Sequence, residues 1–245
     1  MDWLIFREPV SAWTHGLWFL LSIPATLVLL KAACGDRLKQ FGFLVFGVSS
    51  IVCFGSSALF HAVRLRPAQI GFFELLDAIG IYLLIAGSMT PVVLVALTGW
   101  WRRATLAGAW GLAAFGISLR IAWDEMPRPV YTGLYLGMGW GIILSYFALA
   151  RALTHRAMGL GVLGGVLYSI GAVCNLIRWP VPYPGVVGAH EVMHLFVMGG
   201  SLAHFIFMLR VVAPFDRHRF CADPTWHHQA PRHSPRPVHV DGSFP

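Results

Sequence analysis

Histidines and one carboxylate interrupt stretches of sequence that are otherwise apolar. His61 lies near the end of one stretch, Asp77 near the start of the next, and His190 and His194 open the last. His190 and His194 are four residues apart, so on a helix they share one face about 6 Å from each other. Ionisable groups are costly inside a membrane span. Three imidazoles and a water form an open tetrahedral zinc site, so the cluster predicts a metal site.

Neighbouring polar residues extend this cluster and leave several roles open. Ser57 lies one helical turn before His61, and Glu74 lies three residues before Asp77. A carboxylate near a zinc-activated water accepts its proton or holds it by a hydrogen bond. His15 is interpreted either as a partner of the ligands or as an interfacial residue. His204 lies about 21 Å along the helix from His190, so we expect a packing or polar contact there.

The segment from His190 to His194 also matches the HExxH signature of zinc proteases. In that interpretation Glu191 is the general base and the chain is an intramembrane metalloprotease. In the alternative, Glu191 lies about 100° around the helix from His190 and makes a surface or partner contact. Both interpretations remain open at this point.

The composition predicts where these residues sit. The 245-residue chain is 57% hydrophobic and 12% charged, against about 25% charged residues in soluble domains. Its mean hydropathy is +0.66. These values exclude an ordinary cytosolic enzyme, a disordered protein and a secreted disulfide scaffold. The net charge of +7 lies in short gaps between apolar runs, so we expect no nucleic-acid partner.

Seven stretches are long enough to cross a bilayer, which needs about 20 apolar residues. We therefore predict an all-α integral membrane bundle of seven transmembrane helices, in a domain spanning residues 1–213. The Pro- and His-rich tail, 214–245, is expected to be disordered. The predicted spans are Trp13–Leu30, Phe41–Ala62, Ile70–Leu97, Thr105–Trp123, Val130–Leu149, Met158–Ile177 and Val187–Val212.

Connectivity brings the polar residues to one side of the membrane. Spans one, three and seven leave from the side of the N-terminus, and span two arrives there, so the metal site is predicted near that side. The same side carries six Lys and Arg of the chain's eighteen, so the positive-inside rule places it outside the cytoplasm. These six are Arg7, Arg64, Arg66, Arg120, Arg128 and Arg178.

Ordered motifs in ordered spans resemble a known family. Thr14-His15-Gly16 falls in span one, Ser57-x-x-x-His61 in span two and Asp77 in span three, which continues to Thr90-Pro91. Span seven carries the HExxH segment and Gly200-Ser201-Leu202-Ala203-His204. From about Glu8 to Val212, the sequence resembles the bacterial hemolysin III-type membrane proteins. These are related to the progestin and adipoQ receptors and, more remotely, to the alkaline ceramidases.

The resemblance implies a seven-helix bundle in which His61, His190 and His194 hold zinc. It also implies that Asp77 contacts the zinc-bound water and that Ser57 is a polar or oxyanion-type partner. Receptor relatives place the N-terminus and the zinc on the cytoplasmic side, which is opposite to the orientation from the charge count. We expect a multi-pass protein of the bacterial inner (plasma) membrane, and neither the charge count nor the resemblance predicts its oligomeric state.

Four functions compete at this stage. The first is a zinc-dependent hydrolase of a lipid amide or ester, with membrane lipid as substrate or ligand. The second is a membrane sensor or receptor with structural zinc. The third is a pore-forming cytolysin, against which the permanently apolar chain argues, and the fourth is the HExxH protease.

Overall fold

Helices follow from the apolar composition, because a bilayer offers no water to the backbone and each segment must satisfy its own hydrogen bonds. The structure is a computed structural model that describes residues 6–216. Its α-helices are α1 (Pro9–Ala32), α2 (Arg37–Ala62), α3 (Pro67–Ala96), α4 (Gly99–Ala122), α5 (Arg128–Trp140), α6 (Tyr146–Leu153), α7 (His155–Ile177) and α8 (Ala189–Phe207).

The predicted number of membrane crossings is confirmed. In the described part of the chain, seven helical segments are long and apolar enough to span a bilayer. A 3₁₀ turn, Gly141–Ser145, joins α5 to α6 within the fifth crossing, and a π-helical turn, Met208–Val212, extends α8. The fourth crossing begins at Gly99, six residues before the predicted Thr105. Its first turn carries arginines, whose long side chains let charged heads reach the membrane surface from within a helix.

Local sequence signals set several helix starts. The Asp36 carboxylate accepts hydrogen bonds from the backbone N–H groups of Leu38 and Lys39, both at 3.1 Å, and so caps α2. Thr154 caps α7 by accepting from the Ala157 N–H at 3.3 Å. Pro67 opens α3, where its missing N–H costs nothing. These caps satisfy amide groups that a helix leaves unpaired at its N-terminus.

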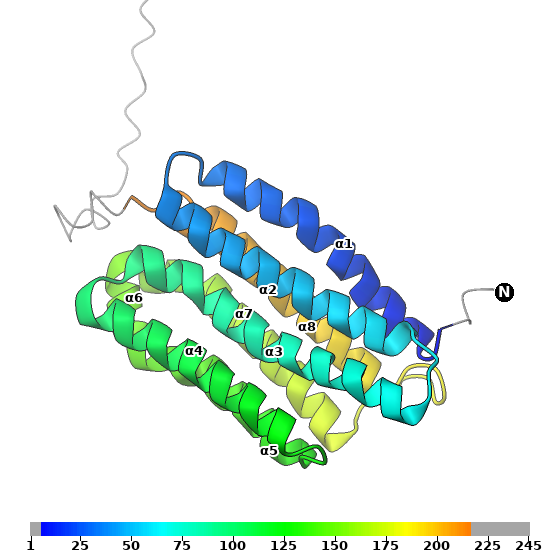
Figure 1. The fold of residues 1–245 in the computed structure, drawn as a ribbon. Coiled ribbons are helices and arrows are strands. Elements are labelled where there is room, and N and C mark those ends of the chain that lie inside the picture. Colours follow the sequence, from blue (N-terminus) through cyan, green and yellow to red (C-terminus); the bar gives the residue numbers. More distant parts are fainter. Residues whose placement is uncertain (1–5, 217–245) are drawn as a thin grey trace, which may run out of the picture.

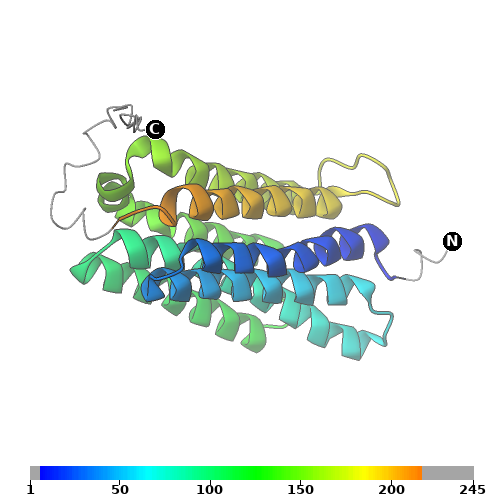
Figure 2. The same cartoon turned by 90° about the horizontal axis from the view of Figure 1, so that it is seen from above.

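The helices run along a common axis, and the first and last crossings are neighbours. α1 packs against α2 and α8, α3 packs against α2 and α4, and α8 packs against α7. Figures 1 and 2 show the start of α1, the α2–α3 turn and the α7–α8 loop at the same end of the bundle. We call this the N-terminal end. The predicted convergence of chain segments on one side is therefore present in the fold.

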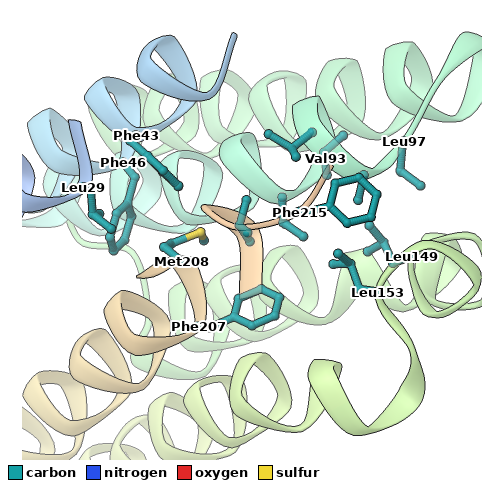
Figure 3. Close-up of a cluster of buried hydrophobic side chains, with 14 of the residues drawn as sticks. Leu29, Phe43, Phe46, Val93, Leu97, Leu149, Leu153, Phe207, Met208 and Phe215 are labelled. Carbon is teal, nitrogen blue, oxygen red and sulfur yellow. The ribbon is translucent and has the colours of Figure 1, made fainter. Parts of the chain in front are cut away.

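A hydrophobic cluster packs toward the opposite end (Figure 3). Its side chains come from the ends of α1, α3, α6 and α8 and the starts of α2 and α7, and some members lie in the middle of α2 and α3. Phe215, just beyond the predicted domain boundary, also packs in this cluster. Most of the predicted tail, 217–245, lies outside the described residues. Labelled members in Figure 3 are Leu29, Phe43, Phe46, Val93, Leu97, Leu149, Leu153, Phe207, Met208 and Phe215.

The close approach of α1 to α2 depends on Gly47, and this generates a stability prediction. A Cβ at Gly47 would collide with the buried side chain of Thr26 on α1. We expect Gly47→Ala to destabilise the protein by about 1–3 kcal/mol, as overpacking does, and to lower Tm in detergent. The matched control is Gly108→Ala in α4, where a Cβ meets no atom within 4 Å. Equal Tm values for the two variants would contradict the prediction.

Candidate metal centre

Three imidazoles meet at the N-terminal end of the bundle. His61 lies in the last turn of α2, and His190 and His194 lie in the first two turns of α8. The Nε2 atom of His190 lies 3.3 Å from that of His61 and 3.1 Å from that of His194. One ligand nitrogen from each of the three residues lies within 4.8 Å of the others. His61 and His194 are each 1% exposed, so these nitrogens face one another away from solvent.

This spacing fits a shared cation. With metal–nitrogen bonds of about 2.0–2.1 Å, two ligands of a tetrahedral site lie about 3.3–3.4 Å apart. Imidazole ligands favour zinc and other transition metals over Mg²⁺ or Ca²⁺. Three protein ligands also leave one coordination position open, as in catalytic rather than structural zinc sites. The three histidines are therefore close enough to bind a metal.

The outer ring nitrogens show that the Nε2 atoms are the ones directed at this point. The Nδ1 atom of His61 is hydrogen bonded to the Glu8 carboxylate. The Nδ1 atom of His194 lies 3.4 Å from the Thr14 hydroxyl oxygen, whose own proton is directed to backbone carbonyls. Both Nδ1 atoms thus act as donors, which leaves the Nε2 lone pairs free for a metal.

Glu8 is the contact that the sequence did not reveal. Its backbone N–H donates to the His61 carbonyl at 3.0 Å, so the residue touches His61 through both its main chain and its side chain. Arg7 forms an ion pair with the same carboxylate at 3.2 Å. The hydrogen bond with His61 is the main reason that the pKa of Glu8 lies below its usual value. Glu8 precedes the first crossing, where no helical periodicity pointed to it.

The other predicted residues form a chain of contacts beside the imidazoles. The His15 ring stacks on His194 with centroids 3.6 Å apart, and its Nδ1 atom lies 2.8 Å from the Ser57 hydroxyl. The Ser57 hydroxyl is also within reach of the Asp77 carboxylate, which interacts electrostatically with His61. Of the two interpretations of His15, the structure places it against a candidate ligand and not at the interface. Asp77 and Ser57 line the same cavity as the three histidines, and their roles stay a prediction.

Glu191 has a different environment from the base of an HExxH protease. One carboxylate oxygen accepts from the Gly188 N–H at 2.8 Å, and the other accepts from the Ser11 hydroxyl at 2.9 Å. The first contact caps α8 and the second ties α8 to α1. The same Gly-x-x-Glu spacing that makes this cap also completes the HExxH pattern. Both oxygens are thus engaged in structural contacts.

A cavity of about 910 Å³ extends from the three histidines into the bundle. Its volume is at the upper end of the range for small-molecule sites, about 300–1,000 Å³. Asp77 and Ser57 line it, and so do Glu74 and Arg120, which form an ion pair of 3.1 Å. Apolar side chains make up most of the rest, among them Ile81, Leu84, Ile85, Leu136, Val197 and Phe207.

Comparison with known proteins shows the family of this chain. Residues 3–205 match the family model described as "Haemolysin-III related". The chain is 36% identical to Hemolysin-3 of Bacillus cereus, over 87% of this chain and 95% of that protein. It is 35% identical to a Hemolysin-3 homolog of Bacillus subtilis, over 84% and 94% of the two chains.

A more distant relative carries a receptor name. The Adiponectin receptor protein of Drosophila melanogaster is 26% identical over 82% of this chain and 50% of that protein. The family resemblance inferred from the ordered motifs is confirmed, as is the link to the receptor branch. With seven membrane-spanning helices and a cluster of three histidines at one end, the chain belongs to the haemolysin-III-related family of multi-pass membrane proteins.

Proposed function

We propose that this protein is a zinc-dependent hydrolase that cleaves an amide or ester bond of a membrane lipid. The observation that carries the proposal is the position of the three imidazole nitrogens at the head of a large, mainly apolar cavity, with Asp77 on its wall. The apolar chain of a lipid would lie against the apolar walls of this cavity. The polar bond to be cleaved would then lie at the three histidines, the only group of three metal-ligating side chains among the described residues. Its expected location is the bacterial inner (plasma) membrane.

His61, His190 and His194 would hold the metal. Zinc in a three-histidine site supplies Lewis acidity to a carbonyl and makes water acidic enough to act as a nucleophile near neutral pH. Glu8 and Thr14, through the two Nδ1 atoms, keep two of the rings in the orientation that a metal needs.

Asp77 is the residue suited to proton transfer. Its carboxylate would accept a proton from the attacking water and then deliver it to the nitrogen or oxygen of the leaving group, so that the products are an acid and an amine or alcohol. Ser57 is hydrogen bonded to His15 and lies within reach of Asp77, so it would position the carboxylate. The apolar walls exclude bulk water from the bond being cleaved.

Two of the alternatives lose support from specific contacts. For a protease that uses Glu191, the carboxylate would have to leave both Gly188 and Ser11. For a permanent pore, the packed hydrophobic cluster toward the end opposite the histidines would have to separate. A sensor or receptor with structural zinc remains as the second candidate, and the receptor name of the insect relative favours it.

Metal binding provides the first test. We expect full-length wild-type protein in detergent to contain about one zinc more per chain than His190→Ala, measured by elemental analysis after dialysis. The histidines of the tail contribute equally to both proteins, so the difference reports the bundle. The control is His155→Ala, whose exposed ring is bonded to Tyr146 and whose loss should leave the zinc content unchanged. Equal zinc in wild type and His190→Ala would refute the centre.

The Glu8 contact can be tested by affinity. Glu8→Gln keeps a hydrogen-bond acceptor next to His61 but removes its negative charge, and loss of such an outer partner weakens metal binding by about 10–100-fold. We expect this loss in a competition titration against a zinc chelator. Glu125→Gln, an exposed carboxylate at the same end, serves as the control. An unchanged affinity in Glu8→Gln would mean that the contact does not tune the site.

Turnover separates the hydrolase from the receptor. We expect wild-type protein to hydrolyse at least one member of a panel of lipid amides and esters in mixed micelles, with products measured by mass spectrometry. Asp77→Asn should lower kcat by about 10²–10⁴-fold while zinc content stays at the wild-type level. Glu191→Gln should retain turnover, whereas the protease interpretation requires the reverse pattern. Zinc-loaded wild-type protein with no turnover on any substrate would favour the receptor.

A further inference from the structure

The far part of the cavity holds a second polar pair that the proposed chemistry does not use. His204 on α8 and Tyr168 on α7 both line the cavity that begins at the three histidines. Their rings lie 5.4 Å apart with an angle of 30° between their planes. Ten residues separate His194 from His204 along α8, which corresponds to about 15 Å. We refer to these two side chains as the His204–Tyr168 pair.

Polar atoms of this pair are buried without a well-formed hydrogen bond. The Nδ1 atom of His204 and the Tyr168 hydroxyl oxygen have no partner of good geometry among the residues that the structure describes. The Gly161 carbonyl and the Ser201 hydroxyl are the groups within reach. Buried polar groups in proteins are nearly always paired with protein, water or ligand. A ligand hydroxyl in the cavity would give these atoms a partner of better geometry than Gly161 or Ser201 provides.

The backbone makes room for both rings. A Cβ at Gly164 would lie 2.9 Å from the Cε1 atom of His204, and a Cβ at Gly200 would lie 2.9 Å from the Cδ1 and Cε1 atoms of Tyr168. Either side chain would therefore be displaced by an alanine at the glycine that it covers. Gly164 and Gly200, on two different helices, thus provide the space that the two rings occupy. The rings are therefore tightly packed against the backbone.

The surroundings select an uncharged ligand group. The charged residues that line the cavity come from the N-terminal end, namely Glu8, Glu74, Asp77, Arg120, Arg128 and Glu191. The described lining near His204 includes apolar neighbours such as Val197, Phe207 and Met208. A charged group there would lose its hydration without gaining a counter-ion, which is costly. A hydroxyl can both donate and accept, as imidazole and phenol require.

We propose that the His204–Tyr168 pair is a second binding subsite, which recognises a hydroxyl group on the chain of an amphiphile whose polar end lies at the three histidines. The distance sets the position of this hydroxyl: about 15 Å of helix equals an extended chain of about twelve carbons. The inference rests on the proposed function for the placement of the polar end. The subsite would make the protein selective for amphiphiles that carry a hydroxyl about twelve carbons from their polar end.

The test uses binding of hydroxylated fatty acids to the full-length protein in detergent. The probes are octadecanoic acid, 12-hydroxyoctadecanoic acid and 3-hydroxyoctadecanoic acid, each measured by displacement of radiolabelled octadecanoic acid. Wild-type protein should bind the 12-hydroxy acid about tenfold more tightly than octadecanoic acid, the gain expected of one buried hydrogen bond. The 3-hydroxy acid should show no such gain, because its hydroxyl lies close to the histidines.

Substitutions at the His204–Tyr168 pair test whether these side chains cause the tighter binding of the 12-hydroxy acid. Tyr168→Phe removes one oxygen and keeps the ring over Gly200, so it should reduce the preference for the 12-hydroxy acid while leaving the affinity for octadecanoic acid within about twofold. His204→Leu should do the same if it folds, and Tyr168→Phe decides the matter if it does not. The matched control is Tyr146→Phe, which loses a cavity-side tyrosine hydroxyl that is bonded to His155 and should keep the full preference.

Three results would overturn the subsite. These are equal affinity of wild-type protein for the 12-hydroxy acid and octadecanoic acid, an equal gain for the 3-hydroxy acid, or a gain that persists in Tyr168→Phe. The readout is equilibrium binding, so it is independent of turnover. A protein that prefers the 12-hydroxy acid but hydrolyses nothing would retain the subsite and lose the hydrolase, whereas a working hydrolase without the preference would lose only the subsite.

Discussion

The mutual approach of three imidazole nitrogens in a non-aqueous interior is the interaction on which the N-terminal end of the bundle depends. Neutral rings in this arrangement direct lone pairs at one another, and protonated rings would place like charges side by side. A shared cation would remove both difficulties. The three histidines join α2 to α8, and their hydrogen-bond partners Glu8 and Thr14 lie just before and within the start of α1.

Packing along the bundle divides the molecule into a polar and an apolar end. In lipid, helices gain little from hydrophobic burial, so small residues and polar contacts must hold them together. Gly47 lets α1 approach α2, and the Ser11–Glu191 hydrogen bond joins α1 to α8. At the opposite end, aromatic and aliphatic side chains around Phe43 and Met208 form a buried hydrophobic cluster. The cavity lies between the polar end and the apolar end of the bundle.

Sequence reasoning identified the features that follow from length, periodicity and connectivity. The seven crossings followed from apolar run length, and the convergence of His61 with His190 and His194 followed from their positions at crossing ends. The fifth crossing was predicted as one helix, but a 3₁₀ turn at Gly141–Ser145 interrupts it. Such a break depends on packing between helices, which hydropathy does not encode.

Contacts that residues make outside regular helices, or between helices, could not be predicted from the sequence. Glu8 gave no signal because its role depends on how the start of α1 folds over the end of α2. Glu191 gave an ambiguous signal, because one spacing serves both a helix cap and a protease motif. The His204–Tyr168 pair combines residues from α7 and α8, and only the three-dimensional arrangement shows that Gly164 and Gly200 seat it.

The adjacency of the first and last crossings has a consequence for biosynthesis. His190 and His194 lie in α8, whereas Glu8, Thr14 and His15 lie at the beginning of the chain. A partial chain that lacks α8 contains His61, Glu8 and Thr14 but not the three-nitrogen arrangement. Addition of the final helix is therefore the step that completes it. Any metal that this arrangement binds would enter only after α8 is in place.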